Sequence, residues 1–546
     1  MQDRSKLQTQ AVDTGSVSQA PGDEAPSSAR LGILWDGAAI ALLVCTAIIV
    51  LAVPVFPSQD GPIHLYYVDI LRSLLTHSGP YTQHFEIKSL LAPYALEYYS
   101  LLAFETVFSP EVSEKLLVCC YIFAFGLGFR YLVNSVAERR NPWTLAGIPF
   151  CMNAFVYLGF VNFSFGVALA LFLSGLWIRS WGRLRPRRVA ALLAGFILLL
   201  LTHPVPIAAF LVFAGLYFVT DLARAAATGS GLWVPSLRAR WRPLAMIALM
   251  GGAAAVWVSM FVNHSQNLAS LPSSVAKNGW IGAVILTLKL WPVTPFTAPS
   301  YRIGLVILLA TTVLAILVSV WKHGGRVCSA AIAMIATSAL CFTLVCIAPA
   351  TVNGSGYLAD RLSIFWLIFA IAAAAASRPP RRLSIAAGVI ALCATCAVLP
   401  FQWVNTSRIA RELRPALEAP RVQAGSVGLI IGDLRSGKRD LTFDPFVWGG
   451  AHYFRRSGAI MANAPWMDLP IIMIRPAHPD RYSYLNPYSA ALSLSSAMNA
   501  GGAPPDLSLV MREGTPGAVT EAIISGLAWS PLTPNGGTFG IYSRPR

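Results

Sequence analysis

Charged residues are scarce in this sequence. Only 12% of its 546 residues are Asp, Glu, Lys or Arg, whereas 55% are hydrophobic, and the mean hydropathy is +0.59. A soluble domain carries more charged side chains than this, because its surface must face water. The composition therefore excludes a soluble globular protein and predicts an integral membrane protein.

Cysteine is missing from every predicted loop and from the chain after residue 396. The nine cysteines all fall in apolar segments, where they pack as small apolar side chains. This distribution excludes a disulfide framework and a thiolate zinc site. The chain also lacks a GxGxxG loop, a P-loop, an HExxH motif and a nucleophile elbow. The function classes that these motifs mark are therefore not indicated.

Long apolar runs are the dominant feature of the sequence. Because a spanning helix needs roughly 20 apolar residues, we predict a mainly α fold, a polytopic transmembrane helical bundle of about eleven spans. The predicted spans are 33–56, 112–136, 143–161, 165–181, 189–202, 205–220, 244–262, 302–321, 327–348, 362–377 and 383–401.

Two apolar segments are compatible with more than one topology. If Tyr94–Phe108 crossed the membrane, several basic loops downstream would fall outside, so we predict that it lies along the outer membrane surface. Residues 190–220 are too long for one span. We predict a helical pair hinged at His203-Pro204-Val205-Pro206, because its prolines cannot continue a helix.

Basic residues cluster in alternate gaps between the predicted spans. The positive-inside rule assigns these gaps to the cytoplasm. In an inner (plasma) membrane, the N-terminus is therefore predicted to be cytoplasmic and the chain after residue 401 extracytoplasmic. Topology thereby accounts for the net charge of +16, and no nucleic-acid partner is predicted. The residues are Arg139, Arg140, Arg179, Arg183, Arg185, Arg187, Arg188, Arg224, Arg238, Arg240, Arg242, Lys322, Arg326, Arg378, Arg381 and Arg382.

The two ends of the chain differ from its middle. Residues 1–31 are polar and lack the apolar run of a cleavable signal peptide, which predicts a disordered cytoplasmic tail. Residues 32–401 are predicted to form the transmembrane domain, with a long first outer loop at 57–110. Residues 402–546 place short β-like runs between turns rich in Gly and Pro, which predicts a small extracytoplasmic α/β domain.

The first outer loop opens with Gln59-Asp60-Gly61-Pro62-Ile63-His64-Leu65. If Pro62 opens a helix, Asp60 and His64 lie four residues apart on one face and act together as catalytic residues. A carboxylate there takes a proton from an attacking hydroxyl or holds a divalent cation beside a phosphate. The structural alternative is that Asp60 caps the helix and His64 packs on lipid headgroups.

Other polar side chains are predicted on the same outer face, where they would bind substrate. Arg361 can grip a phosphate with its planar fork of donors, or extend to ordinary headgroups. His203 precedes Pro204 and is either a hinge residue or a base. The full predicted substrate-binding set is Glu97, His203, Asp360, Arg361 and His452.

The layout resembles that of the GT-C superfamily of polytopic glycosyltransferases. Shared features are a cytoplasmic N-terminus, a long first outer loop that begins with an acid, surface helices in that loop, about a dozen spans and an outer C-terminal domain. The segments Gln59–Leu65, Ala359-Asp360-Arg361-Leu362 and Gly449-Gly450-Ala451-His452-Tyr453-Phe454 also resemble segments of bacterial members.

The resemblance implies an enzyme that moves a hexosyl or pentosyl group on the extracytoplasmic face. The donor would be a polyprenyl-phosphate-linked sugar, the acceptor a lipid, a glycan or a protein, and Asp60 the general base or a metal partner. This chain departs from the pattern, because Gly61 follows Asp60 and the second outer turn offers only Asn162. Whether Asp60 binds a divalent cation, Mg²⁺ or Mn²⁺, therefore stays open. His64, or Glu86 and Glu97, would compensate for the missing second acid.

Three rival functions stay open. A transporter or flippase for lipid-linked sugars or other amphiphiles, in contact with membrane lipids, should place ionisable residues near the middle of its spans, where charges are almost absent in this sequence. A polymerase or ligase of surface polysaccharide would use outer-loop arginines such as Arg361. A noncatalytic envelope scaffold would tolerate substitution of Asp60.

Overall fold

The computed structural model describes most of the membrane-spanning part of the chain. The described residues are 26–137, 141–182, 184–228, 237, 240–262, 272–289, 293–296, 299–325, 327–349, 357–432, 443–462, 464–465, 472–477, 507–513, 530–531 and 539–543. Residues 1–25 of the predicted tail and the basic residues Arg139, Arg140, Arg183, Arg238 and Arg326 lie outside them.

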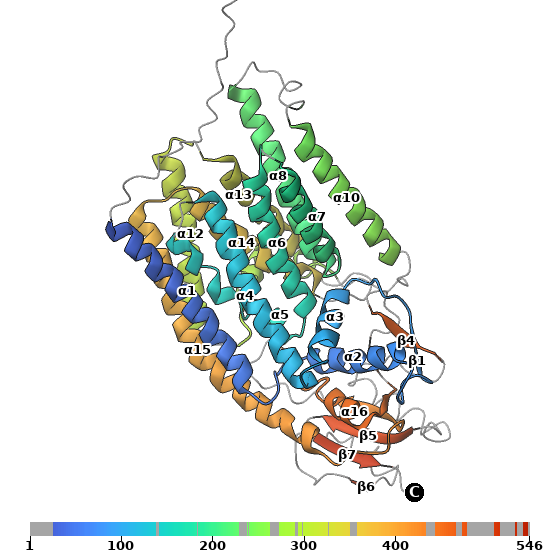
Figure 1. Cartoon of the computed structure of the whole chain (residues 1–546). Coiled ribbons are helices and arrows are strands. Elements are labelled where there is room, and N and C mark those ends of the chain that lie inside the picture. The colour runs from blue at the N-terminus through green and yellow to red at the C-terminus, as the bar shows by residue number, and fades with distance from the viewer. Residues whose placement is uncertain are drawn as a thin grey trace, which may run out of the picture.

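The core of the fold is a bundle of apolar helices (Figure 1). Within the described ranges, nine helices are long and apolar enough to cross a membrane. Each coincides with a predicted span, and the predicted class, a mainly α polytopic bundle, is confirmed. They are α1 (Pro26–Ala52), α4 (Pro110–Val136), α6 (Val161–Ser180), α8 (Pro204–Thr228), α10 (Trp241–Val262), α12 (Pro299–Lys322), α13 (Ser329–Ile347), α14 (Leu358–Ala376) and α15 (Arg381–Glu418).

The predicted span at 143–161 is wrong. The segment is divided into η1 (Pro142–Leu145), η2 (Ile148–Phe150) and α5 (Ala154–Tyr157). Its side chains, including Trp143 and Phe155, are buried within the protein. The segment is apolar because it lies in the core, where irregular backbone can be tolerated at membrane depth.

The predicted helical pair at 190–220 is present, but its first member is short. α7 (Pro186–Leu200) has 15 residues, fewer than the roughly 20 that a span needs, and α8 begins at Pro204 after the predicted hinge. The segment predicted to lie on the membrane surface contains α3 (Ala95–Phe104), of ten residues. A further helix, α11 (Ser274–Leu288), was not predicted, and in it Gly279 interrupts the helical backbone with φ 67°.

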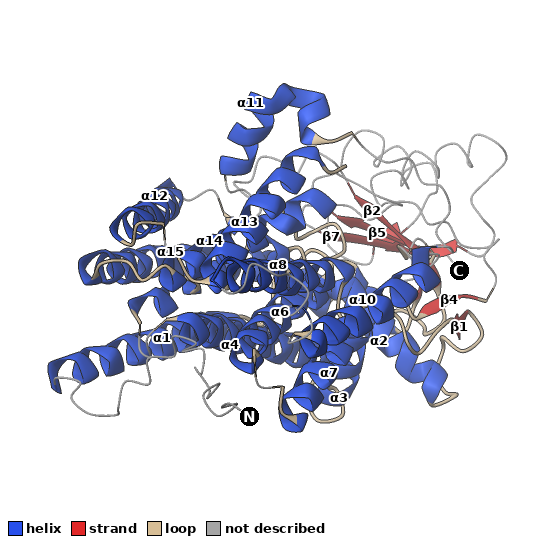
Figure 2. Cartoon of the chain, turned by 90° about the horizontal axis from the view of Figure 1, so that it is seen from above, coloured by secondary structure: helices blue, strands red, loops and turns tan. Residues whose placement is uncertain are grey.

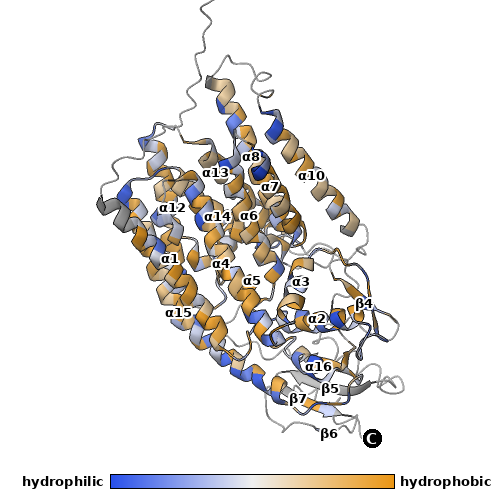
Figure 3. Ribbon diagram, viewed as in Figure 1, coloured by the Kyte–Doolittle hydropathy of each residue, from blue (hydrophilic) through white to orange (hydrophobic). Residues whose placement is uncertain are grey.

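The first loop and the C-terminal strands lie at the same end of the bundle. Here α2 (Gly61–Leu75) packs against α16 (Ala451–Ser457), and α15 runs past its predicted end at 401 to reach the strands (Figure 1). Seen from above, β2, β5 and β7 lie together at one side of the helices (Figure 2). Most of the bundle is hydrophobic, whereas hydrophilic residues are frequent in α2, α16 and the end of α15 (Figure 3).

The C-terminal strands form a mixed sheet of order β3-β2-β5-β7-β6. β2 pairs in parallel with β3 and β5, whereas β7 pairs antiparallel with β5 and β6. Two of the short β-like runs predicted after residue 401, at 427–431 and 507–511, are parts of β2 and β5. The strands are β2 (Val427–Gly432), β3 (Ile460–Met461), β5 (Leu507–Glu513), β6 (Ser530–Pro531) and β7 (Phe539–Ser543).

A second, two-stranded sheet joins the first loop to the C-terminal region. β1 (Phe85–Ile87) of the loop pairs antiparallel with β4 (Ile474–Pro476). The hydroxyl of Tyr66 on α2 also donates to the Ala459 carbonyl at 3.2 Å and accepts from the Met461 N–H at 2.9 Å. Contacts with residues of the C-terminal region therefore hold the loop that carries Asp60.

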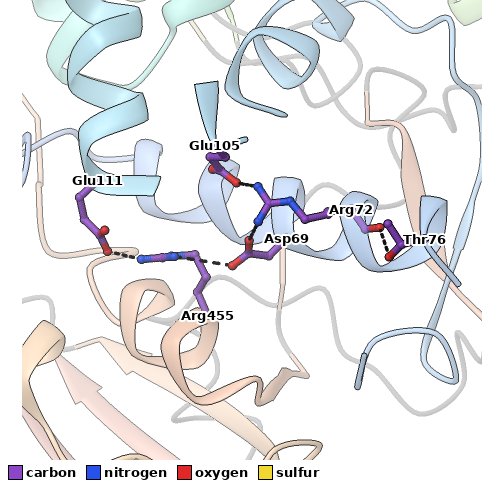
Figure 4. Close-up of polar contacts among 6 residues, drawn as sticks. All are labelled: Asp69, Arg72, Thr76, Glu105, Glu111 and Arg455. Atoms are coloured by element: carbon purple, nitrogen blue, oxygen red, sulfur yellow. Dashed lines mark hydrogen bonds and ion pairs between the residues drawn. The ribbon is translucent and has the colours of Figure 1, made fainter. Parts of the chain in front are cut away.

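Ion pairs reinforce this junction (Figure 4). Arg72 on α2 pairs with Asp69 of the same helix and with Glu105, which caps the C-terminus of α3. Arg455 on α16 pairs with Asp69 at 3.7 Å and with Glu111 in the first turn of α4. The side chain of Arg455 is only 7% exposed, so these two carboxylates, rather than water, balance its charge.

Arg455→Gln is expected to destabilise the folded protein by about 3–5 kcal/mol, because it removes one partner of a buried ion pair. Asp69 and Glu111 would then lack the cation between them in a largely buried site. The measurement is the free energy of unfolding of the detergent-solubilised protein by denaturant titration.

The matched control is Arg475→Gln. Arg475 pairs with Glu86 across β4 and β1, but both side chains are about half exposed, at 56% and 48%. An exposed pair contributes about 0–1 kcal/mol. Equal losses in the two variants would show that burial of the Arg455 cluster does not contribute to stability.

Candidate active site

Asp60 stands at the N-cap position of α2, as the sequence predicted from Pro62. Its side chain makes no capping hydrogen bond, because its backbone is already helical at φ −97° and ψ −12°. The carboxylate instead accepts a hydrogen bond from Gln59 Nε2 at 3.2 Å, and Gln59 Oε1 accepts from the Asp444 N–H at 3.0 Å. Capping therefore does not explain Asp60.

Asp60 is buried, with 3% of its surface exposed. Burial raises the pKa of its carboxyl group to about 7, against the opposing influence of the Gln59 hydrogen bond and the positive charge of Arg361. Loss of hydration disfavours the charged carboxylate, which is why the pKa rises. A carboxyl group with a pKa near 7 is suited to accept a proton during a reaction at neutral pH.

The turn before α6 holds Asp60 in place. The carbonyl of Tyr157 accepts the Gln59 N–H at 2.8 Å, and the carbonyl of Leu158 accepts the Asp60 N–H at 3.2 Å. Gly159 follows with φ +83°, so close that a Cβ atom would lie 2.8 Å from the Gly61 nitrogen. The position of Asp60 thus depends on a short segment about a hundred residues away in sequence.

The same turn also positions Arg361. This residue lies in the first turn of α14, is 4% exposed, and its guanidinium carbon stands 4.5 Å above the centre of the Phe160 ring. It also hydrogen-bonds the hydroxyl of Tyr94. The aromatic face and the hydroxyl orient a planar cation, whose charge acts on Asp60.

Glu97 lies in the same buried region. Its N–H donates to Asn162 Oδ1 at 3.1 Å, and Asn162 Nδ2 donates back to its carboxylate, which ties α3 to the first turn of α6. Burial, and then the negative charge of Glu114, raise the pKa of Glu97 well above its usual value. Burial thus favours the protonated form of Glu97, and its contacts with Asn162 give it a structural role.

Glu114 lies behind the start of α2. Its Oε1 accepts a hydrogen bond from Ser58 Oγ at 2.6 Å, and a Cβ on Gly61 would come within 1.9 Å of the same oxygen. Its Oε2 is buried without a hydrogen-bond partner in the part of the chain that the structure describes. Gly61 is thus required for the close approach of Glu114 to the Asp60 turn.

The two histidines of this region are neutral. Burial lowers the pKa of His64 to about 4, and its Nδ1 lies 3.1 Å from the Tyr98 hydroxyl. Burial, with the charge of Arg361, also lowers the pKa of His203 well below its usual value. His203 Nδ1 accepts the Val205 N–H at 3.1 Å and its ring stacks on Tyr94. His203 therefore caps α8, which agrees with its interpretation as a hinge residue.

Asp360 and His452 occupy other surroundings. Asp360 lines a cavity between α11, α13 and α14. His452 is fully buried on α16, where burial and the charge of Arg455 lower its pKa to about 3. The charges that act on His452 come from Arg455, Glu111 and Arg456. The predicted roles of Asp360 and His452 in substrate binding stay predictions.

A metal at Asp60 was left open by the sequence. Within the described ranges, no group of three or more His, Cys, Asp or Glu side chains is arranged to hold a metal ion. Asp60 offers one carboxylate beside an amide, which does not make a complete protein-derived site for Mg²⁺ or Mn²⁺.

The sequence did not reveal the roles of Gly159, Phe160 and Glu114. Gly159 and Phe160 fell within a predicted span, and Glu114 fell at the start of another. A usable signal was present in the second case, because Glu111, Glu114 and Lys115 place three charges in an otherwise apolar run. For the glycine no such signal exists, since its role arises only from contact with the Asp60 turn.

Gly159→Ala is expected to lower both the thermal stability and the activity of the protein. The methyl group would lie 2.9 Å from the Asp60 nitrogen and 3.0 Å from its Cα, and φ +83° disfavours any L side chain. The Asp60 turn must then move, at a cost of about 1–3 kcal/mol. The measurements are the unfolding midpoint and the activity of the purified protein, with an expected loss of activity of at least about tenfold.

Gly182→Ala separates backbone strain from this clash. Gly182 has a similar φ of +72°, but nothing lies within 4 Å of the position that a Cβ atom would take there. This variant should lose some stability and keep its activity. A similar loss of activity in both variants would contradict a specific role of Gly159 at Asp60.

The fold and the loop site together define a polytopic membrane protein with a GT-C-like fold. Among solved structures, the chain is similar in fold to ArnT from Cupriavidus metallidurans in the apo state. The TM-score is 0.52 at 9% sequence identity, over 95% of this chain and 98% of that chain. No protein-family model matches the chain, and no curated protein matches it in sequence.

Proposed function

We propose that the protein is a membrane glycosyltransferase that moves a sugar from a polyprenyl-phosphate donor to an acceptor on the extracytoplasmic face. The observation that supports this most is a buried carboxyl group of raised pKa, Asp60, on which the charge of a buried cation, Arg361, acts at the loop end of a GT-C-like bundle. The N-terminus would be cytoplasmic and the C-terminal region extracytoplasmic, in an inner (plasma) membrane.

Asp60 would act as the general base. As the acceptor hydroxyl attacks the anomeric carbon, its oxygen bonds to that carbon and its proton passes to Asp60. At the same time the bond between the anomeric carbon and the phosphate oxygen breaks, and the electron pair leaves with the polyprenyl phosphate. A base with a pKa of about 7 is ionised often enough at neutral pH to accept this proton.

Arg361 would stabilise the departing phosphate. Its guanidinium is held against Phe160 and Tyr94 before substrate arrives, so little reorganisation is needed as negative charge develops on the leaving group. Little else is required of the protein than to position the two substrates. His64, Glu97 and His203 would shape the site from its walls, whereas Asp360 lines a separate cavity and His452 is buried on α16.

The proposal is tested in the native host by mass spectrometry of lipid-linked sugars and envelope glycans. A deletion strain is compared with strains complemented by the wild-type protein or by Asp60→Asn, with protein levels matched by immunoblot. We expect one glycosylated product to disappear in the deletion, to return with the wild type, and to stay absent with Asp60→Asn. The identity of that product names both the sugar and the acceptor.

Two outcomes would contradict the proposal. A product restored by Asp60→Asn as well as by the wild type would favour a flippase for lipid-linked sugars or an envelope scaffold, neither of which needs a base. An unchanged glycan profile in the deletion, in cells that normally express the protein, would exclude a glycosyltransferase of envelope components. Chelation of divalent cations in membrane preparations tests whether Mg²⁺ or Mn²⁺ participates at Asp60.

A further inference from the structure

A polar cavity adjoins the first turn of α14, separate from the proposed active site. Its volume is about 190 Å³, and it is formed by residues of α11, α13 and α14 together with short flanking segments. Its polar lining consists of Ser274, Lys277, Asn278, Thr287, Asp360 and Ser363. This volume exceeds the roughly 150 Å³ of a cavity that accommodates benzene, so it is sufficient for a small polar headgroup.

The neighbours Asp360 and Arg361 separate the two sites. Successive residues of an α-helix point about 100° apart, so Arg361 faces Phe160 and the Asp60 region while Asp360 lines the cavity. The cavity lies where α13 ends, at Ile347, and where α14 begins, at Leu358. Ends of spans lie at the depth of the lipid headgroups, and the cavity therefore lies at that depth too.

The cavity carries one charge of each sign. Lys277 from α11 and Asp360 from α14 both line it, and no ion pair within the described ranges joins them. An ammonium group on a flexible stem binds phosphate as a point charge. A carboxylate accepts charge-assisted hydrogen bonds from an ammonium group. The pair is therefore complementary to a group that carries both a phosphate and an amine.

An apolar surface adjoins the polar lining. Trp280 and Ile281 follow Lys277 and Asn278 on α11 and are 59% and 79% exposed, and Ile285, one turn farther on, is 53% exposed. Side chains of this kind next to a headgroup-level cavity contact acyl chains. A ligand with a polar head and a hydrocarbon tail satisfies both surfaces at once.

We infer that this cavity binds the headgroup of a zwitterionic phospholipid whose amine carries N–H donors. Lys277 binds the phosphate, Asp360 accepts hydrogen bonds from the primary ammonium group, and the acyl chains lie along the apolar face of α11. The inference does not depend on the reaction at Asp60, because it concerns a different cavity and is measured by binding.

The test is native mass spectrometry of the full-length protein in detergent, titrated with phosphatidylethanolamine, phosphatidylglycerol or phosphatidylcholine. We expect phosphatidylethanolamine to bind most tightly. Lys277→Gln should weaken phosphatidylethanolamine and phosphatidylglycerol alike, by about tenfold, since a charge-assisted hydrogen bond to the phosphate is lost. Asp360→Asn should weaken phosphatidylethanolamine to the level of phosphatidylglycerol and leave phosphatidylglycerol unaffected or tighter.

Lys289→Gln provides the matched control, because Lys289 follows the same helix as its C-cap residue and does not line the cavity. It should bind all three lipids like the wild type. Equal affinity of the wild type for the three lipids, or equal effects of Lys277→Gln and Lys289→Gln, would overturn the inference. Soluble phosphoethanolamine that displaces the lipid at equal concentration would overturn the acyl-chain contact and identify a site for a free phosphoamine.

Discussion

Asp60→Asn is expected to reduce the proposed sugar transfer by about 10²–10⁴-fold, the range that a general base typically contributes. The substitution keeps the size of the side chain and an oxygen that accepts the hydrogen bond from Gln59, so the Asp60 turn should keep its shape. What the asparagine cannot do is accept the proton of the acceptor hydroxyl. The measurement is kcat/KM for the purified protein in lipid nanodiscs, with a polyprenyl-phosphate sugar and the acceptor identified in the native host.

The pH dependence of the wild type is a second readout of the same residue. Burial raises the pKa of Asp60 to about 7, so the fraction of ionised base grows as the pH rises through 7 and falls as the pH drops below it. The kcat/KM of the wild type should therefore increase up to about pH 7 and then level off. The residual activity of Asp60→Asn should lack this step.

Glu418→Gln is the control for loss of a carboxylate. Glu418 lies on α15, is 60% exposed and pairs with Arg414, so its replacement should change neither kcat/KM nor the pH profile. An Asp60→Asn protein that retains wild-type activity with a normal unfolding midpoint would exclude Asp60 as the base. A pH step that persists in Asp60→Asn would assign the titration to another group.

The bundle could be predicted from the sequence because its cause is local. A run of about 20 apolar residues specifies a span regardless of the rest of the chain, and nine of the predicted spans coincide with helices of the described residues. The segment 143–161 misled the same rule, because a core-facing apolar run and a lipid-facing one have the same composition. Side chains such as Trp143 are apolar because other helices surround them.

The site was predictable only in its parts. Asp60 and Arg361 could be selected as charged residues beside predicted spans, since charges are rare in such a chain. Their relation through the turn at 157–162 could not be predicted, because it depends on Gly159 contacting Asp60 and on Phe160 lying under Arg361. These are contacts between segments far apart in sequence, which no single-sequence pattern records.

The junction with the C-terminal region was hidden for a similar reason. β1 and β4 have three residues each, too few for a recognisable alternation of side chains. Arg455 occurs in a short helix whose charges would ordinarily indicate a solvent-exposed face. Only tertiary packing reveals that Arg455 pairs with Asp69 and Glu111. The C-terminal region thereby contacts the first loop at α2 as well as at β1.

Arg361→Gln is expected to lower kcat/KM for sugar transfer by about 10²–10³-fold, the cost of removing one preorganised donor from developing negative charge. The leaving polyprenyl phosphate would lose its cation in a site where little water can replace it. Arg361→Lys should fall between this variant and the wild type, because lysine keeps the charge but lacks the planar fork that rests on Phe160. The assay is the same as for Asp60→Asn.

The pH profile separates a role in leaving-group stabilisation from a merely structural one. The positive charge of Arg361 lowers the pKa of Asp60, so Arg361→Gln should move the activity step to higher pH, whereas Arg361→Lys should leave it near its original position. Arg378→Gln, which removes an exposed arginine just beyond the other end of α14, controls for loss of positive charge. A rate and a pH step unchanged in Arg361→Gln would remove Arg361 from the mechanism and leave Asp60 without its electrostatic partner.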